Sequence, residues 1–221
     1  MSPAPLVLHG YWRSGTSYRT RIALNVKGVE YRQESLDLRT GAQRSEDYRK
    51  LNPQGLVPAL ETGSAVLTQS TAILEWLEES WPHPPLLPTN PNDRAIVRAM
   101  SLLIACDVHP LNNLRVLNRL RSEFDADDAA VSGWIRHWIV EGFTALEAMI
   151  SHHGGRYSFG DTITMADCHL VPQVYSAERF GVALDTFPKI LAVAARLGER
   201  PDVAAAHPDL HPDSDLALKD R

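Results

Sequence analysis

The chain has 221 residues, of which 44% are hydrophobic and 22% charged, the balance of an ordinary globular protein. Its 22 basic and 27 acidic side chains give a net charge of −5, which argues against sequence-independent binding of nucleic acid. No apolar run approaches the ~20 residues that span a bilayer, and residues 1–10 lack the basic start of a secretory signal. We therefore expect a cytoplasmic protein with no membrane or nucleic-acid partner.

The first 80 residues alternate short strand and helix signals. In chain order, the pattern predicts a strand at 6–8, a helix at 18–27 that ends at Gly28, a strand at 29–38, a short helix near 45–51, strands at 57–60 and 65–67 joined by a tight turn, and an amphipathic helix after Gln69 and Ser70. The order β-α-β-α-β-β-α predicts a mixed sheet with helices packed on it.

Beyond residue 81 the strand signals fade. Five of the fifteen prolines lie within residues 81–91, a composition typical of a linker. The sequence then predicts four helices, at 93–121, 127–152, 164–179 and 188–198. At the start of the third, Thr164 and Asp167 fit a capping box, with Ile163 and Cys168 at the positions of a hydrophobic staple. The last twenty residues are expected to form a loosely held tail. The predicted domains are an α/β domain at 1–81, a linker at 82–92 and an all-helical domain at 93–221.

Three short segments of the first half have the residue types of a binding site. Hydroxyls in the loop from Arg13 to Ser17 could favour an anion or thiolate at a helix start, although Ser17 could simply cap that helix. A cis peptide before Pro58 would turn the Val57 backbone outward to pair with an extended peptide, whereas most such bonds are trans. Ser70 could cap the next helix or hold a carboxylate.

Together, these segments, the proline linker and the helical domain resemble the glutathione transferase family over essentially the whole chain. The segments that resemble its zeta class are YWRSGTSYRTRIALNVKG at 11–28, NPQGLVPAL, LTQSTAILEWLEE, PLLP, DVHPLNNLRVL and TMADCHLVPQVYSAERF. More narrowly, the motifs RSGTS, DVHP and RYSFGD are similar to those of bacterial glutathione-dependent maleylpyruvate isomerases, relatives of the maleylacetoacetate isomerases. The resemblance implies a thioredoxin-like first domain with a mixed four-stranded sheet, and a homodimer.

The resemblance also implies roles for individual residues, with glutathione as the cofactor. Ser14 would hydrogen-bond the glutathione sulfur. Gln69 and Ser70 would hold the γ-glutamyl carboxylate of glutathione, and Val57, ahead of cis-Pro58, would pair with its cysteinyl backbone. Gln43 and Gln54 would lie near its glycyl end. The helical domain would contribute His109, Asn113 and Arg115. The chain departs from the Ser-Ser-Cys core of the zeta class at Gly15 and Thr16, which leaves open whether Thr16 assists Ser14.

The implied reaction is the cis–trans isomerisation of maleylpyruvate to fumarylpyruvate by reversible addition of the glutathione thiolate to the alkene. A protein nucleophile is not needed for it. The substrate is a small keto acid with two carboxylates, and arginine outnumbers lysine 18 to 4. Guanidinium pairs bidentately with carboxylate, so Arg13, Arg115 and Arg179 are the predicted substrate ligands. Maleylacetoacetate isomerase, a conjugating transferase and a non-catalytic glutathione-binding module are the alternatives.

Other reactive side chains have plainer interpretations. Cys106 and Cys168 have no CxxC spacing, and we expect two buried, reduced thiols. The histidines at 152–153 are adjacent, and no zinc-site spacing occurs, so we expect no metal. Trp134 and Trp138 are expected in the core or in an interface.

Overall fold

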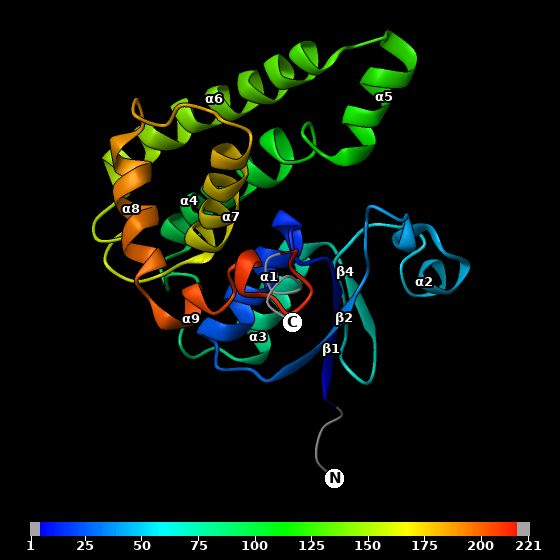
Figure 1. The fold of residues 1–221 in the computed structure, drawn as a ribbon. Helices are drawn as coiled ribbons and strands as arrows, with labels where there is room; N and C mark the ends of the chain where they lie inside the picture. The colour runs from blue at the N-terminus through cyan, green and yellow to red at the C-terminus, as the bar shows by residue number, and fades with distance from the viewer. Residues whose placement is uncertain (1–4, 216–221) are drawn as a thin grey trace. The chain divides into compact units, whose positions relative to one another are not determined.

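The computed structural model describes residues 5–215 and shows two compact units (Figure 1). The first unit contains the chain up to Pro85 together with the segment from Arg200 onward, and the second contains Leu86–Glu199. Predictions for residues 1–4 and for the tail at 216–221 lie outside the described residues.

A mixed four-stranded sheet organises the first unit, as predicted. Its strands are β1 (Leu6–Gly10), β2 (Tyr31–Ser35), β3 (Ala59–Glu61) and β4 (Val66–Thr68), in the order β2-β1-β3-β4. β1 runs parallel to β2, whereas the pairs β1–β3 and β3–β4 are antiparallel. Because β1 and β2 are parallel, the segments that follow them leave the same edge of the sheet.

The helices of the first unit are α1 (Gly15–Val26), α2 (Glu46–Leu51) after the 3-10 turn η1 (Ala42–Arg44), and α3 (Ser70–Ser80). α1 packs on α3, and both contribute to a core whose inaccessible side chains include Leu8, Ile22, Leu24, Leu60, Ile73, Leu74 and Leu77. α1 begins three residues earlier than predicted because Ser14, not Ser17, is its N-cap. It ends as expected before Gly28, whose φ of 65° favours glycine.

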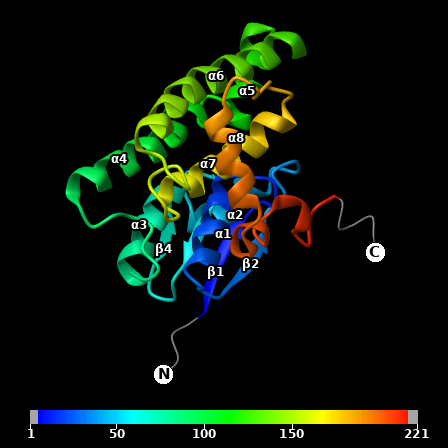
Figure 2. The ribbon, with the colours of Figure 1, turned by 90° about the vertical axis from the view of Figure 1, so that its left-hand side faces the viewer.

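The second unit consists of helices. They are α4 (Pro91–Leu102), the π-helix η2 (Leu103–Val108), α5 (Leu114–Phe124), α6 (Asp128–His153), α7 (Met165–Arg179) and α8 (Pro188–Gly198). α6 packs on η2 and α8, and α7 packs on α4 and α8 (Figure 2). The single helix predicted at 93–121 is wrong, because η2 and a turn containing Pro110 interrupt it. Trp134 and Trp138 are half-buried on α6, with ring centroids 5.6 Å apart.

The C-terminal segment corrects the predicted domain division. α9 (Pro201–Ala204) and the turn η3 (Pro208–Leu210) belong to the first unit, so the all-helical domain ends near residue 199 and not at 221. Figure 1 shows this segment, in red and orange, next to α1, on which α9 packs.

The same segment is firmly attached up to Asp215, in contrast to the expected loose tail. The buried guanidinium of Arg21 donates to the carbonyls of Trp12 (2.9 Å) and Ala206 (3.1 Å), which gives this arginine a structural role. Ser214 is fully buried and its hydroxyl donates to the Asp209 carbonyl at 3.0 Å. Buried hydrogen bonds such as these hold the segment although its sequence has little hydrophobic periodicity.

The expected pair of buried thiols is half right. Cys168 is buried, but Cys106 is exposed because Ile104 and Val108 take the buried positions of the π-helix. Within residues 5–215, no helix is long and apolar enough to cross a membrane.

Candidate active site

The loop between β1 and α1 has a chain of hydroxyls at the start of the helix. The Ser14 hydroxyl accepts from the Ser17 amide at 3.4 Å and lies 2.8 Å from the hydroxyl of Thr16. Thr16 in turn donates to the Val57 carbonyl at 2.9 Å. Since a hydroxyl carries one proton, the proton between Ser14 and Thr16 belongs to Ser14. The Ser14 hydroxyl therefore donates to the Thr16 hydroxyl oxygen, and rotation of the Ser14 hydroxyl would let it donate to an anion instead.

The N-terminal ends of α1 and α3 carry a partial positive charge that no acidic side chain of their first turns offsets. α1 and α3 have no acidic side chain in their first turns, whereas α2 has Glu46 and Asp47 there. The partial positive charge of a helix start stabilises a nearby anion. The hydroxyl of Ser14 at α1 and the hydroxyl of Ser70 at α3 thus lie where a thiolate or carboxylate is favoured.

Gln69 has an unusual backbone conformation at the start of α3. Its φ is 66°, a value that few residues other than glycine adopt. Gln69, and not Ser70 as one interpretation predicted, occupies the N-cap position, and its side chain makes no capping bond. The Gln69 side-chain amide instead donates to the Gln54 side-chain oxygen at 2.8 Å. Strained backbone of this kind often marks a binding site.

Gln43, on η1, holds an unsatisfied acceptor. Its side chain is buried, and its Oε1 atom has no hydrogen-bond partner among residues 5–215. The Gln43 carbonyl lies against Gly55, where a Cβ atom would come within 3.1 Å of it. A buried amide oxygen without a donor costs about 1–3 kcal/mol, which a turn of the Gln43 side chain toward a ligand N–H would recover. With that turn, the residues present fit a ligand with peptide N–H groups.

The loop that carries Val57 is fixed by the cis peptide bond that follows this residue and by hydrogen bonds to the residue that precedes it. The Val57–Pro58 peptide bond is cis, as the resemblance implied. The preceding Leu56 carbonyl accepts from the Tyr48 hydroxyl and from the Asn52 side chain, both at 2.7 Å. Burial raises the pKa of Tyr48 to about 12, so this phenol remains a donor at neutral pH.

Arg13 lies one residue before Ser14, with its guanidinium carbon 5.0 Å from the centre of the Trp12 ring. Tyr11, two residues before Arg13, is buried, and its hydroxyl has no hydrogen-bond partner in the described part of the chain. Burial raises the Tyr11 pKa, and the positive charges of Arg13 and Arg39 oppose this shift. Sequence reasoning missed Tyr11 and Arg39. Tyr11 had a signal in its position two residues before Arg13, whereas Arg39 had none.

The remaining predicted residues all belong to the second unit. His109 is the C-cap of η2, and Asn113 caps α5 by accepting from the Arg115 amide at 3.1 Å. Arg115 is exposed. Arg179 is the last residue of α7, with its guanidinium carbon 4.1 Å from the centre of the Phe180 ring. The approach of His109, Asn113 and Arg115 to the cofactor, and of Arg115 and Arg179 to the substrate, stays a prediction. Over residues 5–215, no group of three or more His, Cys, Asp or Glu side chains could hold a metal ion.

Known proteins match the chain over almost its full length. The family model of the glutathione S-transferase N-terminal domain matches residues 13–80, and that of the C-terminal domain matches residues 120–206. A maleylpyruvate isomerase from a Ralstonia species is 51% identical over 209 residues, which cover 94% of this chain and 99% of the relative.

Two solved structures extend this similarity to the fold. The holo structure of a maleylpyruvate isomerase, a bacterial zeta-class glutathione S-transferase, has a TM-score of 0.93 at 51% identity and covers 94% of this chain and 99% of its own. A maleylacetoacetate isomerase from Methylobacterium extorquens AM1, solved with bound malonate and glutathione, has a TM-score of 0.91 at 36% identity, with coverage of 94% and 99%. The chain therefore belongs to the glutathione S-transferase family.

Proposed function

We propose that the protein is a glutathione-dependent cis–trans isomerase that converts maleylpyruvate to fumarylpyruvate. The observation that carries this proposal is the 51% identity to a maleylpyruvate isomerase over 94% of the chain. The hydroxyl chain from Ser14 to Val57 at the start of α1 supports it, because such a site favours a thiolate.

The first unit supplies the groups that would hold glutathione. Val57 offers backbone groups to the cysteinyl residue, and the start of α3 at Gln69 and Ser70 suits the γ-glutamyl carboxylate. Gln54 is bonded to Gln69, so we place it at the same end of the cofactor and not at the glycyl end. Gln43, with its unsatisfied oxygen, would accept from a cofactor amide.

When bound, glutathione supplies a soft thiolate that adds reversibly to the cis double bond and so permits rotation. The protein's part is to favour the charged form of that thiol. Ser14 turns its proton from Thr16 toward the sulfur, while Thr16 keeps its own bond to the Val57 carbonyl. The start of α1 adds its positive partial charge, because no acidic side chain in its first turn opposes it.

The substrate carries two carboxylates, for which guanidinium groups are the matching partners. Arg13 would bind one of them from the first unit, and Arg115 and Arg179 are the proposed ligands from the second. Charge that develops between the carboxylates during isomerisation is stabilised by the same cations. His109 and Asn113 are proposed to contact glutathione. We further propose that the enzyme is a cytoplasmic homodimer.

A maleylacetoacetate isomerase is the second candidate, and the structural match to such an enzyme supports it. The two substrates differ mainly in the length of the keto-acid arm. Ultraviolet absorbance of each substrate, mixed with the protein with and without glutathione, tests both. Glutathione-dependent formation of the trans product establishes the isomerase, and the ratio of the two rates assigns the substrate. Glutathione binding without isomerisation of either compound would contradict the proposal and leave a transferase or a binding module.

A further inference from the structure

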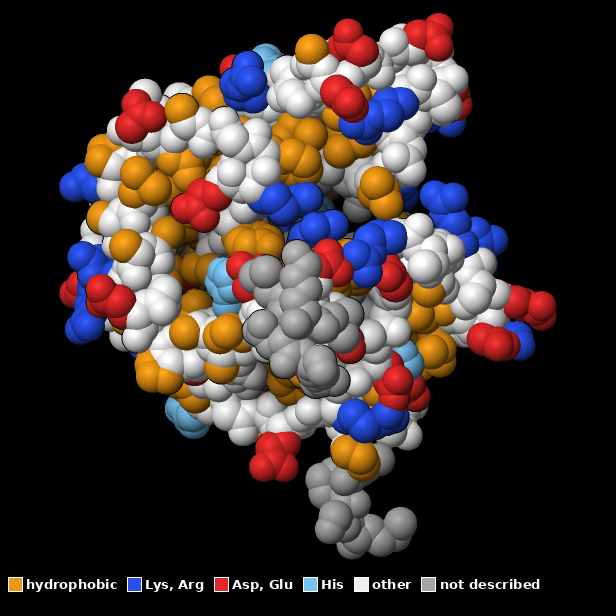
Figure 3. Space-filling view, viewed as in Figure 1, with side chains coloured by type: hydrophobic (Ala, Val, Ile, Leu, Met, Phe, Trp, Pro, Cys, Tyr) orange, Lys and Arg blue, Asp and Glu red, His pale blue; other side chains and the backbone are white. Residues whose placement is uncertain are grey.

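The segments after β1 and β2 leave the sheet side by side. Gly10 pairs with Ser35 in the parallel register, and the Leu36 amide donates to the Gly10 carbonyl at 2.8 Å. Arg13 follows β1 by three residues, and Asp37 follows β2 by two. The arginine next to Ser14 and the acidic loop after β2 therefore lie at one edge of the sheet. The space-filling view shows cationic and acidic side chains next to one another in this part of the first unit (Figure 3).

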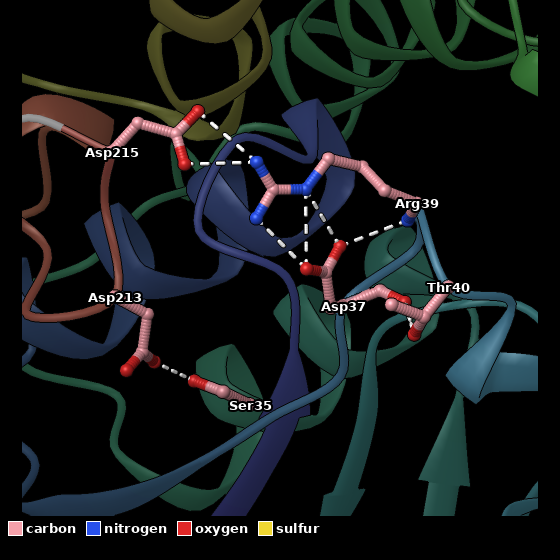
Figure 4. A network of polar contacts seen from close by, with 6 residues as sticks. All are labelled: Ser35, Asp37, Arg39, Thr40, Asp213 and Asp215. Carbon is pink, nitrogen blue, oxygen red and sulfur yellow. Dashed lines mark hydrogen bonds and ion pairs between the residues drawn. The ribbon is translucent and has the colours of Figure 1, made fainter. Parts of the chain in front are cut away.

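At this edge a single guanidinium binds two carboxylates (Figure 4). Arg39 donates from Nε and Nη2 to Asp37 at 2.8–3.1 Å, and from Nη1 to both carboxylate oxygens of Asp215 at 2.8 and 3.1 Å. Paired geometry of this kind fixes both acids in place. One cation and two anions leave the cluster with a net charge of −1.

Asp37 and Asp215 differ in the contacts that hold them besides those with Arg39. Asp37 is fixed by its own turn, because its carbonyl accepts from the Thr40 hydroxyl at 2.9 Å and its carboxylate accepts from the Arg39 amide at 2.9 Å. Asp215 comes from the C-terminal segment, which is also tied to β2 by a hydrogen bond from Ser35 to Asp213. Arg39 thus links the carboxylates of Asp37 and Asp215 through its hydrogen bonds to both.

Arg13 lies within electrostatic range of this cluster. Hydrogen bonds from Arg39 are the main cause of the lowered pKa of Asp37, and the charge of Arg13 lowers it further. Burial is the main cause of the raised pKa of Tyr11, while Arg13 and Arg39 lower this pKa and Asp37 and Asp215 raise it. Without Arg39, the two carboxylates would be uncompensated at the same edge of the sheet as the loop that carries Arg13, and their charge would compete with the substrate for the Arg13 guanidinium.

We infer that Arg39 is a positioning residue for substrate binding, which holds Asp37 and Asp215 in a fixed ion-pair cluster and so leaves the Arg13 guanidinium free for a substrate carboxylate. The inference rests on the proposed function, because it takes Arg13 as a substrate ligand. Arg39 acts through charge compensation and does not touch the substrate. All three members of the cluster are partly exposed, so salt screens the effect and keeps it moderate.

The test compares Arg39→Gln with Arg32→Gln, which removes an exposed arginine of β2 that pairs with Glu34. Arg39→Gln should raise the KM for the dicarboxylate substrate about three- to tenfold at low salt. The kcat and the KM for glutathione should change less than about twofold, and the difference should shrink at high salt. The triple variant Arg39→Gln/Asp37→Asn/Asp215→Asn should recover the wild-type KM. Arg32→Gln should leave all constants near wild type.

Malonate binding, measured by calorimetry with glutathione present, separates this inference from the proposed function. If the wild-type protein binds malonate but isomerises neither substrate, the proposed function fails, and the affinity of the variants for malonate still tests Arg39. If Arg39→Gln binds malonate as tightly as wild type, the inference is wrong. Failure of the triple variant to recover affinity would also overturn it, because Arg39 would then bind the dicarboxylate directly.

Discussion

Two helix starts, those of α7 and α1, use the same kinds of side chain in opposite ways. At α7 the buried Asp167 carboxylate accepts from the amides of Ser158 (2.9 Å) and Thr164 (2.7 Å) and from the Thr164 hydroxyl (3.0 Å). At α1 the only cap is the Ser14 hydroxyl, which accepts a single amide at 3.4 Å. At the start of α7 the protein's own groups fill the hydrogen-bonding capacity, and we call this start closed. The start of α1 is open, because it retains hydrogen-bonding capacity for a further partner.

The difference separates structural from functional polar groups. A buried polar group whose hydrogen-bonding capacity is filled stabilises one conformation, and its removal leaves its partners unsatisfied. A helix start with a weak cap and no acid in its first turn keeps its positive charge available for a ligand. Substitutions of the capping residues at the start of α7 should therefore change stability alone, and substitution of the cap at the start of α1 should change activity far more than stability.

The largest expected effect is at the closed start. Asp167→Ala leaves buried donors of Ser158 and Thr164 without an acceptor and should lower the free energy of unfolding by about 3–5 kcal/mol. Urea unfolding followed by circular dichroism measures this loss. The isosteric Asp167→Asn should cost less, since its side-chain oxygen can still accept. A loss below about 1 kcal/mol for Asp167→Ala would show that the cap is not a stabilising element.

Ser14→Ala tests the open start. It should lower kcat/KM for isomerisation by about 10- to 100-fold, because one donor to the thiolate is lost. It should also raise the pKa of the bound glutathione thiol, measured by ultraviolet titration of the complex. The free energy of unfolding should fall by only about 1 kcal/mol, the usual cost of an N-cap.

Asn90→Ala is the matched control for Ser14→Ala. Asn90 caps α4 by accepting from the amides of Asn92 and Asp93, so its loss should cost a similar amount of stability. Its activity per folded molecule should stay at the wild-type level. Equal losses of activity in the two variants would mean that the start of α1 is only structural.

Gln43→Met sharpens the contrast between structural and functional polar groups, because it should weaken glutathione binding and stabilise the glutathione-free protein. The variant removes the buried Oε1 atom, which has no partner among the described residues. Thermal unfolding without glutathione should therefore shift upward or stay constant, while the dissociation constant for glutathione rises about tenfold. A fall in both stability and affinity would instead indicate that Gln43 is an ordinary structural residue.

Local patterns predicted the closed helix start and much of the fold. The Thr164–Asp167 capping box and the strand and helix order of the first unit follow from spacing within a few residues, and the structure confirms them. The break in the helix predicted at 93–121 was missed although Pro110 marked it in the sequence, and the π-helix η2 just before that proline had no such marker.

The site was predictable only where its residues lie in compact motifs. Ser14, Gln69 and Val57 come from short segments with recognisable residue types, and the resemblance gave them roles that local patterns left open. The positive φ of Gln69 and the hydrogen bond from Thr16 to Val57 depend on how distant segments meet. The pairing of Arg39 with Asp215, 176 residues away, had no local signal at all. Contacts of this kind are determined by tertiary packing and not by propensity.

The smallest expected effect lies in the C-terminal segment, whose contacts sequence patterns did not reveal. Burial lowers the pKa of His211, the nearby Arg21 lowers it further, and Asp213 opposes both. The unfolded chain binds its proton near the ordinary value of about 6.5, whereas the folded protein does so only at lower pH. More protons are then bound in the unfolded state, so stability should fall as the pH drops from about 7 through 6.5 and below. In His211→Asn this part of the pH dependence of the urea midpoint should be absent. If both proteins lose stability in parallel over that range, His211 is not the titrating group, and attachment of this segment does not depend on its neutral form.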